Sequence, residues 1–426
     1  MHHAKKIKKY IVLKVLYISY DGMTDPLGQS QVIPYLKGLS ALGHQISILS
    51  CEKKSRFEKE ENEIRKQLEK NNIKWFPIFY TPKPPVLSTL KDISNLKKKS
   101  KEICTSEQIE IVHCRSYISA IVGEGLKDKF KIKFIFDMRG FWADERVDGN
   151  IWKLNNPLFY FIYNYFKKRE KGFLKNADAV ISLTQNAKKE INSWQGFQKV
   201  PITVIPCCAD LDFFSYKSVN QSDISNLRLE LGLKQEDFVL SYLGSLGTWY
   251  MLDEMLDFFK ILKSKRPLSK FLFITGDEPN LVFNAAKIKN IDSNDIIIRR
   301  ASRNEVPVYC SLSSVSLFFI LPKYSKKASS PTKMGELMSL GIPIICNANV
   351  GDVTEILNDG GVGAVINDFT IADYLFAIER IPSLLEKPAQ QNYNVAQIYY
   401  SLKEGVSKYN EVYQYVANHG DKDGDV

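Results

Sequence analysis

The chain has 426 residues, of which 44% are hydrophobic and 25% charged, and this composition is ordinary for a folded protein and excludes a disordered one. Its length exceeds what one hydrophobic core organises, so we expect two domains of roughly 200 residues each. Residues 1–210 carry 36 Lys and Arg against 22 Asp and Glu, whereas the remainder carries 22 against 26. A basic first half suits an anionic membrane surface, a lipid phosphate or nucleic acid, although a solvated lysine-rich surface has the same composition.

The composition also bears on membranes, thiols and metals. The first apolar run, residues 11–19, contains Lys14 and is too short for a membrane span or a signal peptide, so it predicts a strand. The seven cysteines form no CxxC pair and most lie in apolar runs, which indicates reduced thiols in a cytoplasmic protein. Only His44 and His113 lie away from the chain ends, so we expect no histidine-rich metal site. His44 is interpreted as a structural turn residue.

Strand-like and helix-like segments alternate along the first half of the chain. Helices are predicted from about 31 to 42, at 56–71 and at about 157–175. Strands are predicted at 11–19, 45–50, 75–80, 109–113, 133–137, 177–183 and 202–206. This alternation is typical of a doubly wound parallel sheet. Because ligands of such sheets bind beyond the carboxyl ends of the strands, the loop 21–31, Arg115 and the loop 137–146 are candidate site segments.

A polar segment at 207–235 is interpreted as a linker to a second, similar series. Strands are predicted there at 238–247, 271–277, 295–300, 314–321 and 342–346. Polar residues at their carboxyl ends are again site candidates, including Gly244, Ser245 and Arg300. Neither a GxGxxG nor a GxxxxGK[ST] loop occurs, which argues against a dehydrogenase or an NTPase. An amphipathic, Tyr-rich helix is predicted at 394–416.

The segment 328–343 predicts a short helix with signals at both ends. Ser330 is the expected N-cap with Pro331 at the first helical position, and Gly341 is the expected left-handed residue after the helix. A helix that begins beyond a parallel strand offers free N–H groups and a positive dipole to an anion. Glu336 follows on the second turn, where its carboxylate can accept hydrogen bonds from sugar hydroxyls. The same pattern also describes a capped core helix with a solvated glutamate.

Four segments together resemble the retaining GT-B glycosyltransferases of family 4, the group that builds capsule, O-antigen and exopolysaccharide. They are the Gly-containing loop after the first strand, ValIleProCysCysAlaAsp at 204–210, TyrLeuGlySerLeu at 242–246, and SerProThrLys…Glu…GlyIlePro at 330–343. The resemblance implies a GT-B fold, in which two Rossmann-like doubly wound domains face each other across a cleft. The expected domains are 1–206 for the acceptor and 207–393 for the nucleotide sugar. A helix at about 394–418 would pack back on the first domain, ahead of a disordered tail at 419–426.

The resemblance also implies roles for individual residues. Glu336 matches the family glutamate that holds the ribose hydroxyls of the donor. The other expected donor-binding residues are Gly244, Ser245, Arg300, Ser329, Ser330, Thr332 and Lys333. Asp137 and Arg139 stand where the family often places a His or Asp near the transferred sugar, although an ion pair that closes their loop is an equal interpretation. Acceptor-side residues are expected at Asp21, Gly28, Gln29 and Arg115.

Retaining transfer in this family needs no protein nucleophile, so catalysis is expected to consist of positioning and stabilisation of the leaving diphosphate. Asp137, Arg139 and Lys333 are the expected catalytic residues. No cofactor and no metal are expected, since the nucleotide-diphosphate sugar is a co-substrate. The expected acceptor is a glycan, linked to a polyprenyl diphosphate. We expect a cytoplasmic protein with no nucleic-acid partner, in peripheral contact with the anionic inner face of the membrane through residues 4–10 and 53–99.

Two departures from the family pattern keep alternatives open. Ala328 stands where the motif has its first glutamate, and Ser245 stands where an arginine usually neutralises the diphosphate. Lys333 is the expected substitute, with Arg300, Arg303 and the lysines at 323, 326 and 327 as other candidates. The alternatives are a GT-B sugar-nucleotide epimerase and a non-catalytic partner of a neighbouring transferase.

Overall fold

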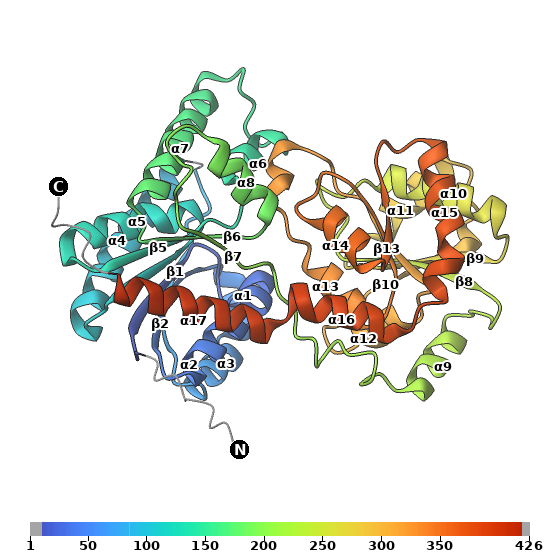
Figure 1. The fold of residues 1–426 in the computed structure, drawn as a ribbon, viewed down its shortest axis with the longest axis horizontal. Coiled ribbons are helices and arrows are strands. Elements are labelled where there is room, and N and C mark those ends of the chain that lie inside the picture. Colours follow the sequence, from blue (N-terminus) through green and yellow to red (C-terminus); the bar gives the residue numbers. More distant parts are fainter. Residues whose placement is uncertain (1–10, 85, 420–426) are drawn as a thin grey trace, which may run out of the picture.

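The computed structural model describes residues 11–84 and 86–419, which form two lobes side by side (Figure 1). In the described part of the first lobe, a sheet of seven parallel strands has the order β3-β2-β1-β4-β5-β6-β7. The strands are β1 (Lys14–Ser19), β2 (Gln45–Glu52), β3 (Lys74–Phe79), β4 (Ile111–Arg115), β5 (Lys133–Asp137), β6 (Ala179–Ser182) and β7 (Ile202–Val204). They match the seven predicted segments closely, because each is a short apolar run between polar turns.

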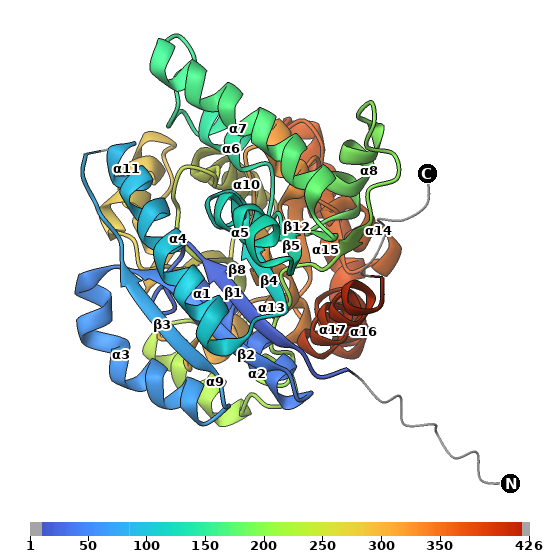
Figure 2. The ribbon, with the colours of Figure 1, turned by 90° about the vertical axis from the view of Figure 1, so that its left-hand side faces the viewer.

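Helices cover both faces of this first sheet (Figure 2). They are α1 (Pro26–Gln31), α2 (Ile33–Ala41), α3 (Lys54–Glu69), α4 (Leu87–Glu107), α5 (Ser116–Phe130), α6 (Trp142–Asp148), α7 (Pro157–Asn176) and α8 (Gln185–Ser193). Two segments that were predicted as loops, at Arg115 and at 137–146, are shorter loops in the structure. Arg115 is the last residue of β4 and α5 begins directly after it, and α6 occupies much of the predicted loop 137–146.

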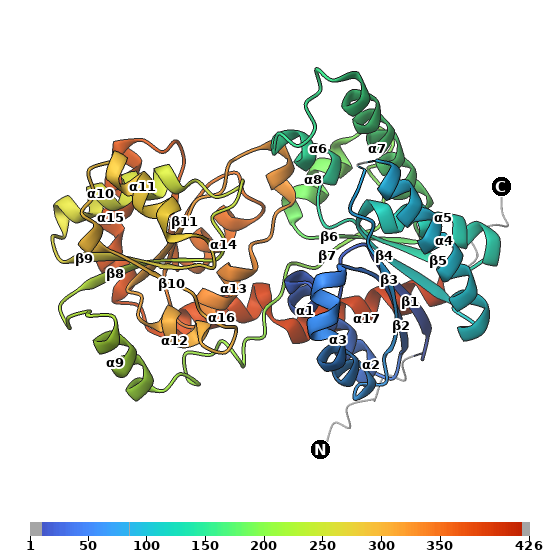
Figure 3. The same cartoon turned by 180° about the vertical axis from the view of Figure 1, so that it is seen from behind.

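The described part of the second lobe repeats this architecture with six parallel strands in the order β10-β9-β8-β11-β12-β13 (Figure 3). The strands are β8 (Phe238–Leu243), β9 (Ser269–Ile274), β10 (Ile296–Arg299), β11 (Val315–Phe318), β12 (Ile344–Asn347) and β13 (Gly363–Ile366). The predicted architecture of two doubly wound domains is therefore confirmed. The strand β13 was not predicted, because its four residues carry little periodic signal.

The helical segments of the second lobe are α9 (Gln221–Glu230), α10 (Leu252–Lys265), α11 (Pro279–Ile288), η1 (Ser293–Asp295), α12 (Val306–Ser311), η2 (Tyr324–Ala328), α13 (Thr332–Ser339), α14 (Val353–Gly360) and α15 (Ile371–Leu385). The segment interpreted as a linker, 207–235, thus contains α9. That helix buries little more than Leu227, so its apolar periodicity is weak.

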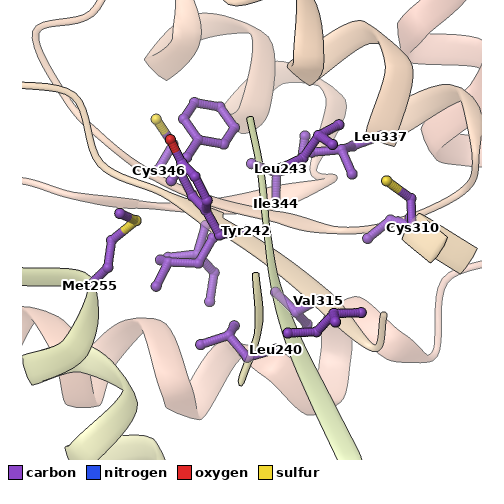
Figure 4. Close-up of a cluster of buried hydrophobic side chains, with 14 of the residues drawn as sticks. Leu240, Tyr242, Leu243, Met255, Cys310, Val315, Leu337, Ile344 and Cys346 are labelled. Carbon is purple, nitrogen blue, oxygen red and sulfur yellow. The ribbon is translucent and has the colours of Figure 1, made fainter. Parts of the chain in front are cut away.

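The core of the second lobe lies directly beneath α13 (Figure 4). Leu240 and Tyr242 from β8 are fully buried beside Ile344 from β12 and Leu337 from α13. Burial of large apolar side chains on both faces of β8 explains its almost continuous apolar sequence, which is typical of a parallel strand. The same packing fixes the position of α13 relative to the carboxyl end of β8.

The C-terminal segment joins the two lobes. Two helices, α16 (Ala389–Tyr400) and α17 (Leu402–Asn418), replace the single helix predicted at 394–416, because the chain is extended at Ser401, whose side chain caps α17. The helix α16 packs on α13, where a Cβ at Gly335 would lie 2.6 Å from the Tyr400 Cβ. The helix α17 runs along the first lobe (Figure 1). The predicted tail at 419–426 lies outside the described residues, apart from His419.

Buried polar contacts anchor α17 to the first sheet. His44 Nε2 lies 2.9 Å from Asn410 Oδ1, and Tyr413 Oη lies 2.9 Å from His113 Nδ1. The fifth strand is also tied to the helix, because the Tyr409 hydroxyl donates to Asp137 Oδ2 at 3.1 Å. Both interior histidines therefore serve this interface. None of the described helices is both long enough and apolar enough to cross a membrane.

Acidification is predicted to weaken the anchor at His44. Its Nδ1 accepts from the Leu13 amide at 3.3 Å while Nε2 donates to Asn410, so only the neutral ring satisfies both contacts. Burial lowers the pKa of His44, so the unfolded chain binds the extra proton first and stability is lost as the pH falls below about 6.5. We expect the unfolding midpoint to fall more between about pH 7 and 5 in the wild type than in His44→Gln. Parallel curves would contradict this role.

Candidate active site between the two domains

A cavity of about 540 Å³ separates the carboxyl ends of the two sheets. It lies at the strand pairs β1–β4 and β8–β11, where the strand order of each sheet reverses, and open α/β sheets bind ligands at such points. From the first domain the cavity is lined by Asp21, Gln31, Arg115, Ser116, Arg139 and Gly140, among others. From the second domain its lining includes Trp249, Tyr250 and residues 328–332. Candidate residues from both halves of the sequence thus meet in one place.

The two domains touch beside this cavity, where η2 lies against α6 and α8. Lys326 Nζ donates to Glu145 Oε1 at 2.7 Å across the interface and lies 3.4 Å from the centre of the Trp249 ring. The Ser325 amide donates to Asp148 Oδ2 at 2.9 Å. Lys326 is therefore part of the domain contact, and its pKa is lowered by burial despite the neighbouring carboxylate.

The amino end of α13 opens into the cavity. Ser329, Ser330 and Thr332 all line it, and no side chain caps the helix. The expectation that Ser330 is the N-cap is wrong: the helix begins at Thr332, and the Ser330 hydroxyl instead accepts a hydrogen bond from the Cys207 amide at 3.1 Å. Gly341 has φ +78°, as expected for the residue that ends the helix. The first N–H groups of α13 remain available to an anion.

Lys333 lies on the first turn of α13 in a cage of aromatic rings. Its Nζ is 3.9 Å from the centre of the Tyr250 ring and 4.5 Å from that of Tyr242. Gly244, at φ +112°, leaves room for this amine, because a Cβ there would lie 3.0 Å from Nζ. Burial lowers the pKa of Lys333 to about 7. An anion near this amine would favour its charged form.

Glu336 is buried on the second turn of α13, and its Oε1 accepts from Arg303 Nη1 at 2.6 Å. The Arg303 guanidinium also lies over the Phe214 ring at 4.5 Å. Glu336 does not line the cavity itself but lies one turn along α13 from Thr332, which does. The pair therefore extends the polar surface of the site away from the cavity and towards α12.

The other donor-side candidates lie near the cavity without lining it. Ser245 is exposed, and its carbonyl accepts from the Tyr242 hydroxyl at 2.5 Å. Arg300 is exposed and lies against Gly276, where a Cβ would be 3.5 Å from its guanidinium. Lys327 pairs with Glu190 at 2.7 Å. Of the basic substitutes considered for the diphosphate, Lys333 is the one beside both Gly244 and the α13 amino end.

Asp137 is the last residue of β5 and Arg139 lies in the loop after it, but their side chains lie in different surroundings. Asp137 is fully buried between His113, at 3.5 Å, and Tyr409, and does not line the cavity. Burial opposes its charged form, but the Arg139 guanidinium and the His113 ring outweigh burial and lower the pKa of Asp137. Arg139 lines the cavity, with its Nη1 3.8 Å from Asp137 Oδ2. The two residues form an ion pair, and the arginine alone reaches the site.

The acceptor-side candidates divide in the same way. Asp21 and Arg115 line the cavity and contact each other, with Arg115 Nε 3.3 Å from Asp21 Oδ2. Gly28 packs against the backbone of Gly22, where a Cβ would meet a carbonyl oxygen at 2.2 Å. Gln29 donates to Glu60 on α3 and to the Thr24 carbonyl. The structure therefore places Gly28 and Gln29 outside the cavity lining.

Sequence reasoning missed Trp249 and Tyr250, and it included Gln31 only as the last residue of the loop 21–31. Gln31 is buried, lines the cavity and donates to the Cys208 carbonyl at 3.3 Å. No local pattern separates Gln31 from Gln29, because the buried face of a helix as short as α1 is chosen by the 206–208 segment that packs on it. Ala328 lies against Gly140 at the cavity wall, with its Cβ 3.8 Å from the Cβ position of that glycine. Among residues 11–84 and 86–419, no group of three or more Cys, His, Asp or Glu side chains could hold a metal.

Two family models match the chain in succession. The model of glycosyltransferase family 4 matches residues 30–213, and that of the glycosyl transferases group 1 matches residues 223–397. A search of the curated proteins finds none that matches the chain. The two models meet between β7 and β8, so the first covers β2 to β7 of the first sheet and the second covers all six strands of the second sheet.

Solved structures of the same fold cover almost the whole chain. Sucrose-phosphate synthase from Thermosynechococcus elongatus has a TM-score of 0.71 at 14% identity, and the match covers 95% of this chain and 99% of that one. HepE from Anabaena, in complex with UDP and glucose, has a TM-score of 0.67 at 14% identity over 94% and 98% of the two chains. WaaG, a glycosyltransferase involved in lipopolysaccharide biosynthesis, has a TM-score of 0.62 at 15% identity over 92% and 97%.

Proposed function

Because this chain is a GT-B glycosyltransferase of the family 4 type, we propose that it moves a hexosyl group, with retention, from a nucleotide-diphosphate sugar to a glycan acceptor carried on a polyprenyl diphosphate. The observation that carries this proposal is the uncapped amino end of α13, which faces the interdomain cavity with Lys333 on its first turn. The likeness to WaaG, a glycosyltransferase involved in lipopolysaccharide biosynthesis, supports a role in polysaccharide biosynthesis. The two family models favour a transferase over the epimerase and the non-catalytic partner.

In this proposal the donor diphosphate lies at the amino end of α13, where free N–H groups and the helix dipole favour an anion. The ribose lies beside Glu336, whose carboxylate would exchange part of its contact with Arg303 for the ribose hydroxyls. The HepE structure, which is in complex with UDP and glucose, supports a nucleotide-sugar donor. Ser329, Ser330 and Thr332 would contact the phosphates and the sugar from the cavity lining.

Transfer requires stabilisation of the charge that develops on the departing diphosphate. The Lys333 amine is suited to this task because its pKa of about 7 is set by burial, and a bound diphosphate would raise that pKa and favour the ammonium form. Positioning of the acceptor hydroxyl would supply most of the remaining effect. The mechanism assigns no step to a protein nucleophile, a cofactor or a metal ion.

We expect Glu336→Gln to reduce catalytic efficiency at least tenfold, because it removes one charged hydrogen-bond acceptor worth about 1.5–3 kcal/mol. The same variant should show a smaller rise in unfolding temperature than the wild type with a UDP-, GDP- or ADP-sugar, whichever stabilises the wild type most. Asp359→Asn, on an exposed turn of α14, is the matched control. Unchanged efficiency in folded Glu336→Gln would remove this residue from the donor site.

Lys333→Met is expected to lower turnover about 100-fold, as loss of one charge-stabilising donor does, while leaving the unfolding temperature nearly unchanged. Stability should be kept because methionine is apolar, of similar length, and enters a cage of aromatic rings. Lys327→Met, which removes an exposed lysine, is the control. Near-normal turnover in Lys333→Met together with loss of turnover in Arg300→Met or Arg303→Met would assign the phosphate contact to those arginines.

We further propose that the first domain contacts an anionic membrane, where a lipid-linked acceptor would be found. The amino end of α7 and the loop before it carry exposed apolar residues at the end of this lobe (Figure 2). They are Ile151, Leu154, Leu158, Tyr160, Phe161 and Tyr165. Exposed lysines flank them at Lys153 and Lys168. In the region 53–99, the exposed Leu87 and Leu90 lie beside Lys91, Lys97 and Lys98 on α4; residues 4–10 lie outside the described part of the chain.

The chain is expected to float with anionic vesicles more than with neutral ones, and less so as salt rises, because such attraction is screened within about a Debye length. Phe161→Ser should reduce flotation, since Phe161 is 70% exposed and its burial in lipid would be lost. Leu229→Ser, at an exposed position of the second domain, serves as the control. Equal partition to neutral and anionic vesicles would contradict the proposed contact.

A further inference from the structure

Two arginines of the first domain are buried at the wall of the interdomain cavity. Arg115 ends β4 and is 6% exposed, and the Arg139 side chain, in the loop after β5, is 9% exposed. Arginine remains charged in proteins, so two guanidinium ions are held here with little water around them. Burial of a charge is costly unless hydrogen bonds and opposite charges satisfy it.

The protein satisfies these two guanidinium groups only in part. Arg115 Nε lies 3.3 Å from Asp21 Oδ2, and Arg139 Nη2 lies 3.2 Å from Cys207 Sγ, a weak acceptor. The Arg139–Asp137 contact, at 3.8 Å, is too long for a hydrogen bond. Among the described residues, no hydrogen-bond partner meets Arg115 Nη1, Arg139 Nε or Arg139 Nη1, although all three atoms are buried. Buried donors of this kind are normally paired.

A helix begins directly after Arg115. The fifteen-residue α5 starts at Ser116, its N-cap position is Arg115 itself, and no side chain caps it. Ser116 and Ile118, on its first turn, line the cavity. The free N–H groups and the dipole of α5 therefore add to the positive potential of the two arginines.

The backbone is strained at Ser116 and at Arg139. Ser116 has φ +66° and Arg139 has φ +58°, a conformation that costs a non-glycine residue free energy and persists where the surrounding structure imposes it. Gln31 also lines the cavity, and its Oε1 is buried with no hydrogen-bond partner among the described residues. The polar groups of the wall thus combine unpaired anion-binding donors with an unpaired hydroxyl acceptor.

We propose that Arg115, Arg139 and the amino end of α5 form a subsite for an oxyanion carried by the acceptor. This inference rests on the proposed glycosyl transfer and specifies the substrate class: an acceptor that is anionic close to the hydroxyl that receives the sugar. The acceptor is favoured over the donor as the source because the arginines and α5 belong to the first domain, whereas α13 and Lys333 belong to the second. A diphosphate of the lipid carrier and a carboxylate on an acidic sugar share the required chemistry.

The test uses the full chain with its donor site already filled by the nucleoside diphosphate that stabilises it most. Calorimetric titration then follows four probes: geranyl diphosphate, geraniol, methyl glucuronide and methyl glucoside. We expect one saturable site for at least one anionic probe and none for its neutral counterpart. Arg115→Met and Arg139→Met should each weaken this binding at least tenfold, whereas Arg65→Met, which removes an exposed arginine of the same domain, should not. Arg115→Lys keeps the positive charge but not the planar, forked guanidinium. We therefore expect it to weaken binding of the anionic probe less than Arg115→Met does.

The outcomes separate the sources and the two proposals. Binding of geranyl diphosphate alone identifies the carrier diphosphate, and binding of the glucuronide alone identifies an acidic sugar. Absence of any anion site in the nucleotide-filled protein overturns the inference, as does binding that neither arginine variant weakens. If the arginine variants instead lose the nucleoside diphosphate, the arginines belong to the donor site and the acceptor assignment is wrong. Failure of every nucleoside diphosphate to bind the wild type would refute the proposed function, and the anionic probes would then still report on the arginines.

Discussion

The geometry of the site depends on how one buried lysine is paired across the domain interface. Lys326, from η2, is almost fully buried, yet it pairs with Glu145 of α6 and lies against the Trp249 ring. Removal of Glu145 would leave the buried Lys326 charge unpaired, which is far more costly than the pair itself is stabilising. Nearby, Asp352 accepts from the amides of Gln185 and Asn186 at the start of α8, at 2.7 and 2.9 Å. These contacts hold the α13 amino end opposite Arg115 and Arg139.

Some of the basic groups at the cavity between the domains are already paired with carboxylates and others are not. Lysines 326 and 327 and Arg303 are paired with carboxylates, so the positive charge near the cavity that is not paired in this way comes from Lys333, Arg115, Arg139, Arg146 and two uncapped helix ends. These groups lie on opposite walls, one set on each domain. Burial lowers the pKa of Lys333 to about 7, and an anion beside the amine would raise that pKa and favour the charged form. We propose that the two sets of groups bind two anions, a donor diphosphate at α13 and an anionic acceptor at the arginines.

Much of this molecule follows from local sequence alone. Short apolar runs separated by amphipathic segments indicate strands and helices whatever the rest of the fold. The doubly wound architecture and most strands, such as 133–137, were therefore predicted from residue pattern. The glycine at 341 and the proline at 343 likewise determine where α13 ends, because few other residues permit that backbone. The α13 segment and Glu336 were identified as a site for the same reason: a helix start after a parallel strand exposes N–H groups regardless of the rest of the fold.

Contacts between segments that are distant in sequence decided which polar side chains line the site. Ser330 is a good capping residue, but its hydroxyl is bound to the Cys207 amide, 123 positions away in sequence. Gln29 and Gln31 are equivalent in the sequence, and only packing on the 206–208 segment turns Gln31 towards the cavity. Asp137 and Arg139 are two residues apart, yet α17 covers the first and leaves the second at the site. Local pattern therefore determined the elements and their order, whereas the assignment of polar side chains to the site required the assembled domains, because burial and pairing are set by neighbours that are remote in the chain.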